Sequence, residues 1–154
     1  EVRGPNVFKG YWRMPEKTAA EFRADGFFIT GDLGVQDGEG RLTLVGRSKD
    51  RIISGGFNVY PSEVEAAIDA LPGVRESAVI GLPHPDLGEA VAAVVVPEAG
   101  ATVDEAAILA ALTGSLARFK QPRRVFVAAD LPRTAMGKVQ KAALRSAHSG
   151  AFGG

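Results

Sequence analysis

The residue types that bind nucleotides and phosphates are concentrated in three segments of the chain: Thr30-Gly31-Asp32, Gly46–Glu65 and Pro132–Lys141. In the first, a carboxylate follows Thr-Gly at the end of a β-rich run. Such a carboxylate can accept two hydrogen bonds from a vicinal diol such as ribose. Taken alone, an Asp in this setting more often bonds to the backbone of its own turn. Asp32 is therefore a candidate ribose ligand with a structural alternative.

The central segment, Gly46–Glu65, combines clustered charges with two consecutive glycines, Gly55 and Gly56. A hairpin that only needs to turn is satisfied by Asn-Gly or Asp-Gly. The glycine pair therefore indicates a backbone that a ligand approaches closely, because a Cβ would obstruct that approach. A glycine-containing hairpin that simply leads into a helix at Pro61 is an equally good interpretation.

The third segment ends in Gly137-Lys138, which resembles the end of a phosphate-binding P-loop. It lacks two features of that loop, because Val139 stands where Ser or Thr would hold magnesium and Pro132 stands where the first glycine belongs. What remains is a lysine beside a glycine that can bring a point charge to a phosphate. An exposed lysine without a function is the alternative.

The elements that must position these segments follow from the hydrophobic pattern, which predicts an α+β fold. From Gly46 onward we expect a unit with a three-stranded sheet, helices and an N-terminal β-hairpin. Before it, the pattern predicts a β-rich strip with little core of its own. The expected elements are a helix at 15–22, strands at 27–30, 41–45, 77–82, 90–96 and 124–128, and helices from Pro61, from a capping box at 102–105 and from Lys138 to Ala147.

Composition excludes several classes of function. The absence of cysteine rules out disulfides, thiolate ligands and a protein thiol nucleophile, and it fits a cytoplasmic protein. With two His residues and no clustered ligands, we expect no metal site. Lys+Arg and Asp+Glu balance at 18 each, so no global field points to nucleic acid or a membrane surface. The longest apolar run, Ala90–Val96, is too short to span a bilayer.

The basic residues gather toward the end of the chain. Residues 118–145 hold eight basic residues against one acid, Asp130. Nucleic-acid binding there is disfavoured, because only Phe119 and Phe126 interleave the basic residues as stacking aromatics.

In their order along the chain, the segments ITGD, GRSKDRIISGGFNVYPSEVE and PRTAMGKVQK closely resemble the C-terminal part of the adenylate-forming enzymes, the AMP-binding acyl-CoA synthetase superfamily. The opening segment GPNVFKGYWRMPEKT is also similar to that family, so the resemblance covers residues 1–147. It implies a ligase that activates a carboxylate with Mg-ATP, releases pyrophosphate and passes the acyl group from its adenylate to the thiol of CoA.

The resemblance also implies roles in adenylation. Asp32 matches the residue that binds the ribose hydroxyls of ATP and AMP, and Arg47 matches the residue that supports this contact. Lys138 matches the catalytic lysine that reaches the carboxylate and the α-phosphate. Lys49 occupies the position of the hinge about which a small lid domain swings between the two half-reactions.

For thioester formation, the resemblance implies that the pantetheine arm of CoA runs beside Gly55, Gly56 and Phe57. The attacking thiol belongs to CoA, so a chain without cysteine poses no difficulty. The CoA phosphates would meet basic residues of the C-terminal stretch, and the sequence does not choose among Arg118, Lys120, Arg123 and Arg124. A solvated basic surface is an equally good interpretation for each of them.

The implied domain organisation has three parts. Residues 1–48 match the end of a large N-terminal AMP-binding domain, residues 49–147 the mobile C-terminal lid domain, and residues 148–154 a flexible tail. The phosphate loop and the acid pocket belong to the rest of the large domain, which would also hold most of the ATP and its Mg²⁺. We therefore expect the chain alone to be inactive.

Within the superfamily, the segments SGGFNVYPSEVE, VIGLPHPDLGEAV and LPRTAMGKVQK are most similar to malonyl-CoA synthetases, which implies malonate or a similar small acid as substrate. Another acyl- or aryl-CoA ligase, or an adenylation domain that loads a carrier protein, is the alternative. A non-catalytic binding module is disfavoured, because a binder would need none of the matched charged residues. The spacing of Pro132, Gly137 and Lys138 also matches the pattern at which related synthetases are acetylated, which implies a lysine acetyltransferase acting on Lys138.

Overall fold

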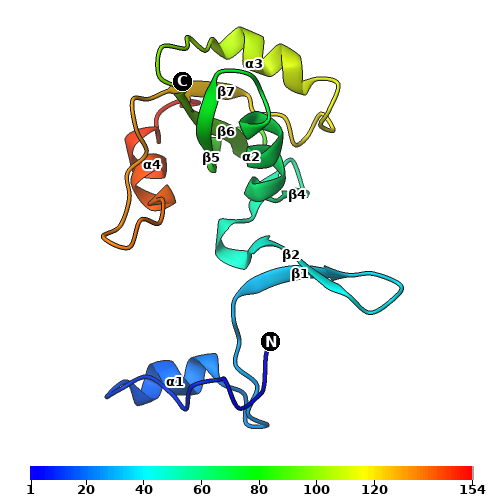
Figure 1. Ribbon diagram of the computed structural model, residues 1–154, viewed down its shortest axis with the longest axis vertical. Coiled ribbons are helices and arrows are strands. Elements are labelled where there is room, and N and C mark those ends of the chain that lie inside the picture. The colour runs from blue at the N-terminus through cyan, green and yellow to red at the C-terminus, as the bar shows by residue number, and fades with distance from the viewer. Residues whose placement is uncertain (154) are drawn as a thin grey trace. The chain divides into compact units, whose positions relative to one another are not determined.

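The computed structural model describes residues 1–153, and the chain divides into two compact units, Glu1–Lys49 and Asp50–Gly154. Figure 1 shows the elements of each unit along the chain. No helix within the described residues is long and apolar enough to cross a membrane. Residues 1–153 also hold no group of three or more His, Asp or Glu side chains placed to share a metal ion.

The first unit contains helix α1 (Pro15–Glu21) and an antiparallel pair of strands, β1 (Asp32–Gln36) and β2 (Leu42–Arg47). The helix begins at a proline, which suits a first helical position. The strand expected at 27–30 is absent, because Phe28 makes only isolated bridges and its ring packs against Phe8 and Phe22. Gly31 then takes a left-handed conformation, with φ +72°, and the paired strand begins after it.

The second unit is built on one mixed sheet. Its strands are β3 (Ile52–Ser54), β4 (Phe57–Val59), β5 (Val74–His84), β6 (Gly88–Pro97) and β7 (Arg124–Val127). Strands β5 and β6 are antiparallel, whereas β7 lies parallel to β6. The predicted hairpin, β3–β4, joins the same sheet through a single residue pair, Ser54↔Gly88. The α+β fold is therefore confirmed, with the hairpin and the three predicted strands continuous in one five-stranded sheet.

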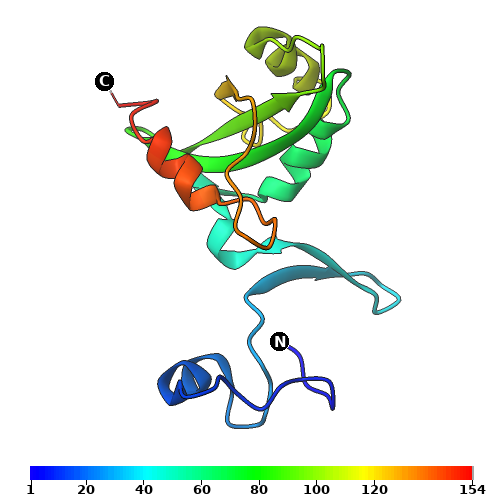
Figure 2. The same ribbon diagram turned by 60° about the vertical axis from the view of Figure 1, so that its left-hand side comes forward.

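Helices cover both faces of this sheet, as Figure 2 shows. Helices α2 (Pro61–Asp69) and α3 (Glu105–Leu112) pack on one face, and α4 (Lys141–Ala147) packs on the other. Each face of the sheet has its own hydrophobic core, and alternate residues of β6 point into one or the other. Val91, Ala93 and Val95 pack on the side of α2 and α3, and Ala92, Val94 and Val96 pack on the side of α4. The apolar run that the sequence shows is thus explained by burial on both faces.

Two helices start at residues other than those expected. The N-cap of α3 is Asp104 and not Thr102. Asp104 Oδ2 accepts a hydrogen bond from the backbone N–H of Ala107 at 3.1 Å. Helix α4 begins at Lys141, three residues after Lys138. The backbone around Lys138 instead forms a small loop, closed by a bridge between Arg133 and Val139.

The end of the chain is in contact with the core. His148 stacks on Phe126 with ring centroids 4.0 Å apart, and Phe152 packs beside His84 on the face that carries α4. The mobility expected for residues 148–154 stays a prediction, and residue 154 lies outside the described residues.

Candidate functional site

Asp32 and Arg47 lie directly opposite each other in the β1–β2 pair. Arg47 Nε is 3.0 Å from Asp32 Oδ1, and Arg47 Nη1 donates to the carbonyl oxygen of Thr30 at 2.7 Å. The alternative role for Asp32, in which its carboxylate accepts a backbone N–H of its own turn, is not seen. Instead, the backbone N–H of Asp32 donates to the Thr30 hydroxyl at 3.1 Å. Within residues 1–153, Asp32 Oδ2 has no hydrogen-bond partner. This oxygen is free to accept hydroxyl groups.

Lys49 lies in the short 3-10 helix η1 (Ser48–Asp50) and is the last residue of the first unit. Its side chain is exposed, and its ammonium group has no ion pair or hydrogen bond with any described residue. The division between the two units falls directly after this residue. The hinge role of Lys49 stays a prediction.

Gly55 and Gly56 form the two-residue turn between β3 and β4. Their φ angles are +56° and +84°, and a type I′ hairpin turn requires positive φ at both positions. The hairpin alternative is therefore sufficient to account for the glycine pair, and the passage of a ligand beside Gly55 and Gly56 stays a prediction. Their surroundings differ, however. A Cβ on Gly55 would lie 3.2 Å from Leu87 Cδ2, whereas a Cβ on Gly56 would meet no atom within 4 Å.

Phe57, the residue after this turn, stacks on Phe119 with ring centroids 4.7 Å apart and an interplanar angle of 25°. Both rings are partly exposed to solvent. They belong to the lining of a pocket of about 330 Å³, which we call the hairpin pocket. Its lining consists of Ser54, Gly55 and Phe57 from the hairpin, Leu87 and Val91, and Arg118, Phe119, Gln121 and Arg123 from the segment before β7.

The structure distinguishes among the four basic residues that the sequence left open. Lys120 Nζ lies 2.6 Å from a carboxylate oxygen on α2, and Arg124 Nε lies 3.1 Å from a carboxylate oxygen on α3. Arg118 and Arg123 form no ion pair with any residue of the described chain, and both line the hairpin pocket. Two cations without counter-charges therefore border two exposed aromatic rings.

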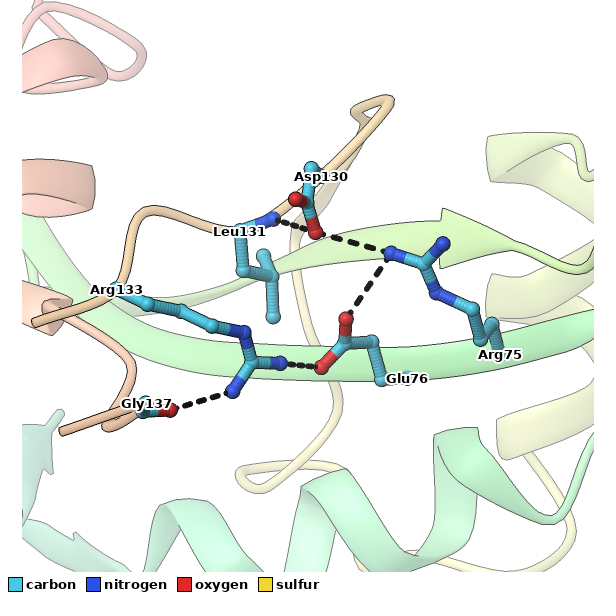
Figure 3. Close-up of polar contacts among 6 residues, drawn as sticks. All are labelled: Arg75, Glu76, Asp130, Leu131, Arg133 and Gly137. Carbon is cyan, nitrogen blue, oxygen red and sulfur yellow. Dashed lines mark hydrogen bonds and ion pairs between the residues drawn. The ribbon is translucent and has the colours of Figure 1, made fainter. Parts of the chain in front are cut away.

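Lys138 lies on the loop between β7 and α4. The backbone N–H of Thr134 donates to the Lys138 carbonyl at 2.8 Å, and the Lys138 N–H donates to the Thr134 hydroxyl at 3.2 Å. The side chain of Lys138 is exposed, and its ammonium group has no partner among residues 1–153. Figure 3 shows how Arg133 ties this loop to Glu76 on β5. The loop thus holds its backbone firmly and leaves its cation available.

The structure therefore places the predicted residues in three groups. Asp32 and Arg47 are together in the first unit, Gly55 and Phe57 share the hairpin pocket in the second, and Lys138 lies on a separate loop of the second unit. Sequence reasoning missed the Thr30 carbonyl and the lining residues Leu87 and Gln121, for which no local pattern exists. It named Phe119 only as an aromatic residue within the basic stretch, and not as part of a pocket lining.

Comparison with known proteins identifies the second unit. The family model described as the AMP-binding enzyme C-terminal domain matches residues 63–138. The chain is 49% identical over 140 residues to an indoleacetate–CoA ligase of Aromatoleum aromaticum, covering 91% of this chain and 27% of that protein. The chain thus spans less than a third of the length of this relative.

Solved structures agree over nearly the whole chain. ATP-bound MatB from Rhodopseudomonas palustris is 61% identical with a TM-score of 0.89, covering 97% of this chain and 30% of that one. The amide bond synthetase McbA from Marinactinospora thermotolerans is 41% identical with a TM-score of 0.85, covering 94% of this chain and 29% of that one. The chain belongs to the acyl-CoA ligase superfamily, and residues 63–138 form its AMP-binding enzyme C-terminal domain.

Proposed function

We propose that the chain is part of an ATP-dependent acid–CoA ligase, which converts a carboxylate to its acyl-adenylate and then to the CoA thioester. The hairpin pocket carries this proposal, because it combines the features that CoA requires. Its exposed aromatic rings suit the apolar stretches of pantetheine, and Arg118 and Arg123 offer unpaired charge to the phosphates. A solvated basic surface would need neither the pocket nor the stacked rings.

In the adenylation half-reaction, the chain supplies groups that bind and neutralise. The free Oδ2 of Asp32 accepts the ribose hydroxyls of ATP, while Arg47 holds the carboxylate by its other oxygen. Lys138 brings its charge to the oxygens on which negative charge gathers in the transition state. Mg²⁺ would enter with ATP and be held mainly by the rest of the protein, since residues 1–153 offer it no cluster of carboxylates.

Lys49 is the proposed pivot between the half-reactions. Its position at the junction of the two compact units supports this role, because a change of backbone angles there would reorient one unit without repacking either core. Lys138 and the hairpin pocket would then be presented in turn.

We propose malonate or a similar small acid as the substrate. The proposal rests on the resemblance of three segments to malonyl-CoA synthetases, and the 61% identity to MatB supports it. Related sequences carry other names, including feruloyl-CoA synthase and 2-succinylbenzoate–CoA ligase. Since the acid pocket is expected outside this chain, the acid has to be assigned by assay.

The decisive assay uses the full-length protein that carries this chain with its AMP-binding region. Pyrophosphate exchange is measured with a panel of acids, and thioester formation is measured with CoA and with a carrier protein. Exchange with malonate and transfer to CoA are the expected results. Transfer only to the carrier would favour a carrier-loading adenylation domain, and exchange with no acid in the panel would overturn the proposal.

The hairpin pocket has its own test. Arg123→Gln should raise KM for CoA, whereas turnover with pantetheine, which lacks the nucleotide phosphates, should not change. Arg124→Gln is the matched control, because the adjacent arginine is paired with Glu105 on α3. Equal KM values for CoA in both variants would remove Arg123 from the phosphate site.

Regulation by a lysine acetyltransferase is a further part of the proposal. The exposed Lys138 side chain is accessible to a modifying enzyme, and acetylation would remove the charge used in adenylation. Full pyrophosphate exchange after stoichiometric acetylation of Lys138 would contradict this. A cytoplasmic location is likewise proposed.

A further inference from the structure

The loop that carries Lys138 has few apolar anchors to hold its shape. Leu131 is buried at its start, but Met136 is 83% exposed at its tip. Its conformation depends on polar contacts within the loop. The backbone N–H of Gly137 donates to the Thr134 carbonyl at 2.9 Å, and that of Gln140 donates to the Pro132 carbonyl at 2.7 Å.

Arg133 connects this loop to the sheet through both arms of its guanidinium group. Nη1 donates to the carbonyl oxygen of Gly137 at 2.8 Å, and Nη2 donates to Glu76 Oε2 on β5, as Figure 3 shows. The carbonyl that Arg133 holds belongs to the peptide group that joins Gly137 to Lys138. A planar guanidinium can make two directed bonds at once, which a lysine ammonium does less well.

Glu76 is itself held from a second side. Arg75 Nη2 lies 3.2 Å from Glu76 Oε1 and 2.9 Å from Asp130 Oδ1, and the same Asp130 oxygen accepts the backbone N–H of Leu131 at 3.0 Å. The network of Figure 3 therefore fixes the loop to β5 at its beginning and next to Lys138. The side chain of Glu76 is only 25% exposed, which limits competition from water.

The network is not explained by folding stability alone. Ion pairs between partly exposed side chains contribute little to stability, and the side chain of Arg133 is 39% exposed. The face of the sheet below the loop already has an apolar core that includes Leu144 and Leu131. What the network adds is a fixed direction for the peptide that precedes a long, unpaired lysine side chain.

We propose that Arg133, held by Glu76, is a positioning residue that orients Lys138 for adenylation; this inference rests on the proposed function. Arg133 itself does not contact substrate. It acts by fixing the Gly137 carbonyl, and therefore the backbone from which the Lys138 side chain extends. A displacement of about 1 Å at a reacting group is enough to cost on the order of 100-fold in rate.

The test uses the full-length protein and measures the two half-reactions separately. Arg133→Gln should lower kcat of pyrophosphate exchange by about 10- to 100-fold, with KM for ATP unchanged. Thioester formation from supplied acyl-adenylate and CoA, and the thermal midpoint, should match the parent. Arg133→Lys should lose nearly as much exchange activity as Arg133→Gln, because it keeps charge next to Glu76 but cannot hold both partners as a planar fork.

Two further variants separate positioning from general damage. Arg133→Gln combined with Lys138→Met should be no slower in exchange than Lys138→Met alone, since Arg133 acts only through the lysine. Arg41→Gln, which removes an arginine paired with Asp37 and Glu39 in the first unit, is the matched control and should behave as the parent.

Parent-like exchange in Arg133→Gln would overturn the inference, and so would an equal loss of both half-reactions. An additional loss in the double variant, relative to Lys138→Met, would overturn it as well. Failure of the proposed function is a distinguishable result, because the parent itself would then exchange pyrophosphate with no acid.

Discussion

The glycine pair of the β3–β4 turn offers a direct test of whether CoA passes beside it. Gly55→Asn keeps the turn, because Asn-Gly is the preferred pair for a type I′ hairpin and Asn tolerates positive φ. Gly55→Ala does not, since a left-handed conformation costs roughly 1–2 kcal/mol for a residue with a Cβ. The two variants therefore separate the demand of the turn from the demand of a ligand.

The expected effects on stability can be worked out from the surroundings of Gly55. Its added Cβ would lie 3.2 Å from Leu87 Cδ2, the end of a flexible side chain that can yield by a few tenths of an ångström. Gly55→Asn should therefore change the free energy of unfolding by less than about 0.5 kcal/mol. Gly55→Ala should lower the thermal midpoint by roughly 2–4 °C for each kcal/mol of left-handed strain. Calorimetry or thermal melts of both variants would measure this.

The expected effect on function depends on Leu87, which lines the hairpin pocket together with Gly55. A side chain at position 55 narrows this pocket, so Gly55→Asn should raise KM for CoA about tenfold, equivalent to about 1.4 kcal/mol of lost binding. Pyrophosphate exchange, which needs no CoA, is the internal control and should stay at the parent rate. If the stably folded Gly55→Asn variant formed thioester with the parent KM for CoA, the glycines would serve the turn alone.

Three further predictions concern other parts of the chain. Lys138→Met should slow pyrophosphate exchange by about 100- to 1,000-fold, because it removes the charge offered to the transition state. The thermal midpoint should not change, because the lysine ammonium has no partner within residues 1–153. A lowered midpoint would contradict this. Gly81→Ala should lower the free energy of unfolding, measured with denaturant, by about 1–3 kcal/mol. The added Cβ would lie 2.6 Å from Glu89 Oε1 and would displace the carboxylate that accepts the Ile53 N–H at 2.9 Å. Unchanged stability would show that Glu89 moves freely. Partial burial, with two nearby carboxylates, raises the pKa of Asp69 in the folded chain above its usual value of 3.8. The folded chain is therefore destabilised as the pH rises from 3.8 through the raised pKa, because Asp69 then ionises in an unfavourable site. Asp69→Asn should therefore be more stable than the parent at neutral pH and lose this advantage in acid, and an advantage that is independent of pH would exclude the titration.

The core of the second unit could be predicted because its signals are local. The apolar run Ala90–Val96 has the length of a strand buried on both faces, and Val64 and Ile68 share a helical face after Pro61. Both features are where the pattern puts them, with Val64, Ile68 and the whole of Ala90–Val96 buried. Exact helix starts could not be predicted, because Asp104 and Thr102 offer the same capping chemistry two residues apart.

The site depends on contacts that no local pattern encodes. Choosing among the basic residues of 118–124 requires their counter-charges, and the partner of Lys120 is 57 residues away. The pairing of Asp32 with Arg47 follows from the register of β1 and β2, whereas the sequence placed Asp32 at the end of a strand that does not form. The family resemblance supplied these roles without supplying their geometry.

The attachment of the β3–β4 hairpin has a consequence for engineering. One residue pair, Ser54↔Gly88, joins the hairpin to β6; the Gly55 N–H also donates to the Leu87 carbonyl at 3.0 Å, and the Glu89 carboxylate accepts the Ile53 N–H at 2.9 Å. Because Ile52 and Val59 anchor the hairpin in the core shared with α2 and α3, only its turn end can be exchanged without disturbing that core or the β5–β6 ladder. Replacing residues 54–57 together with Leu87 is therefore a compact route to reshaping the hairpin pocket.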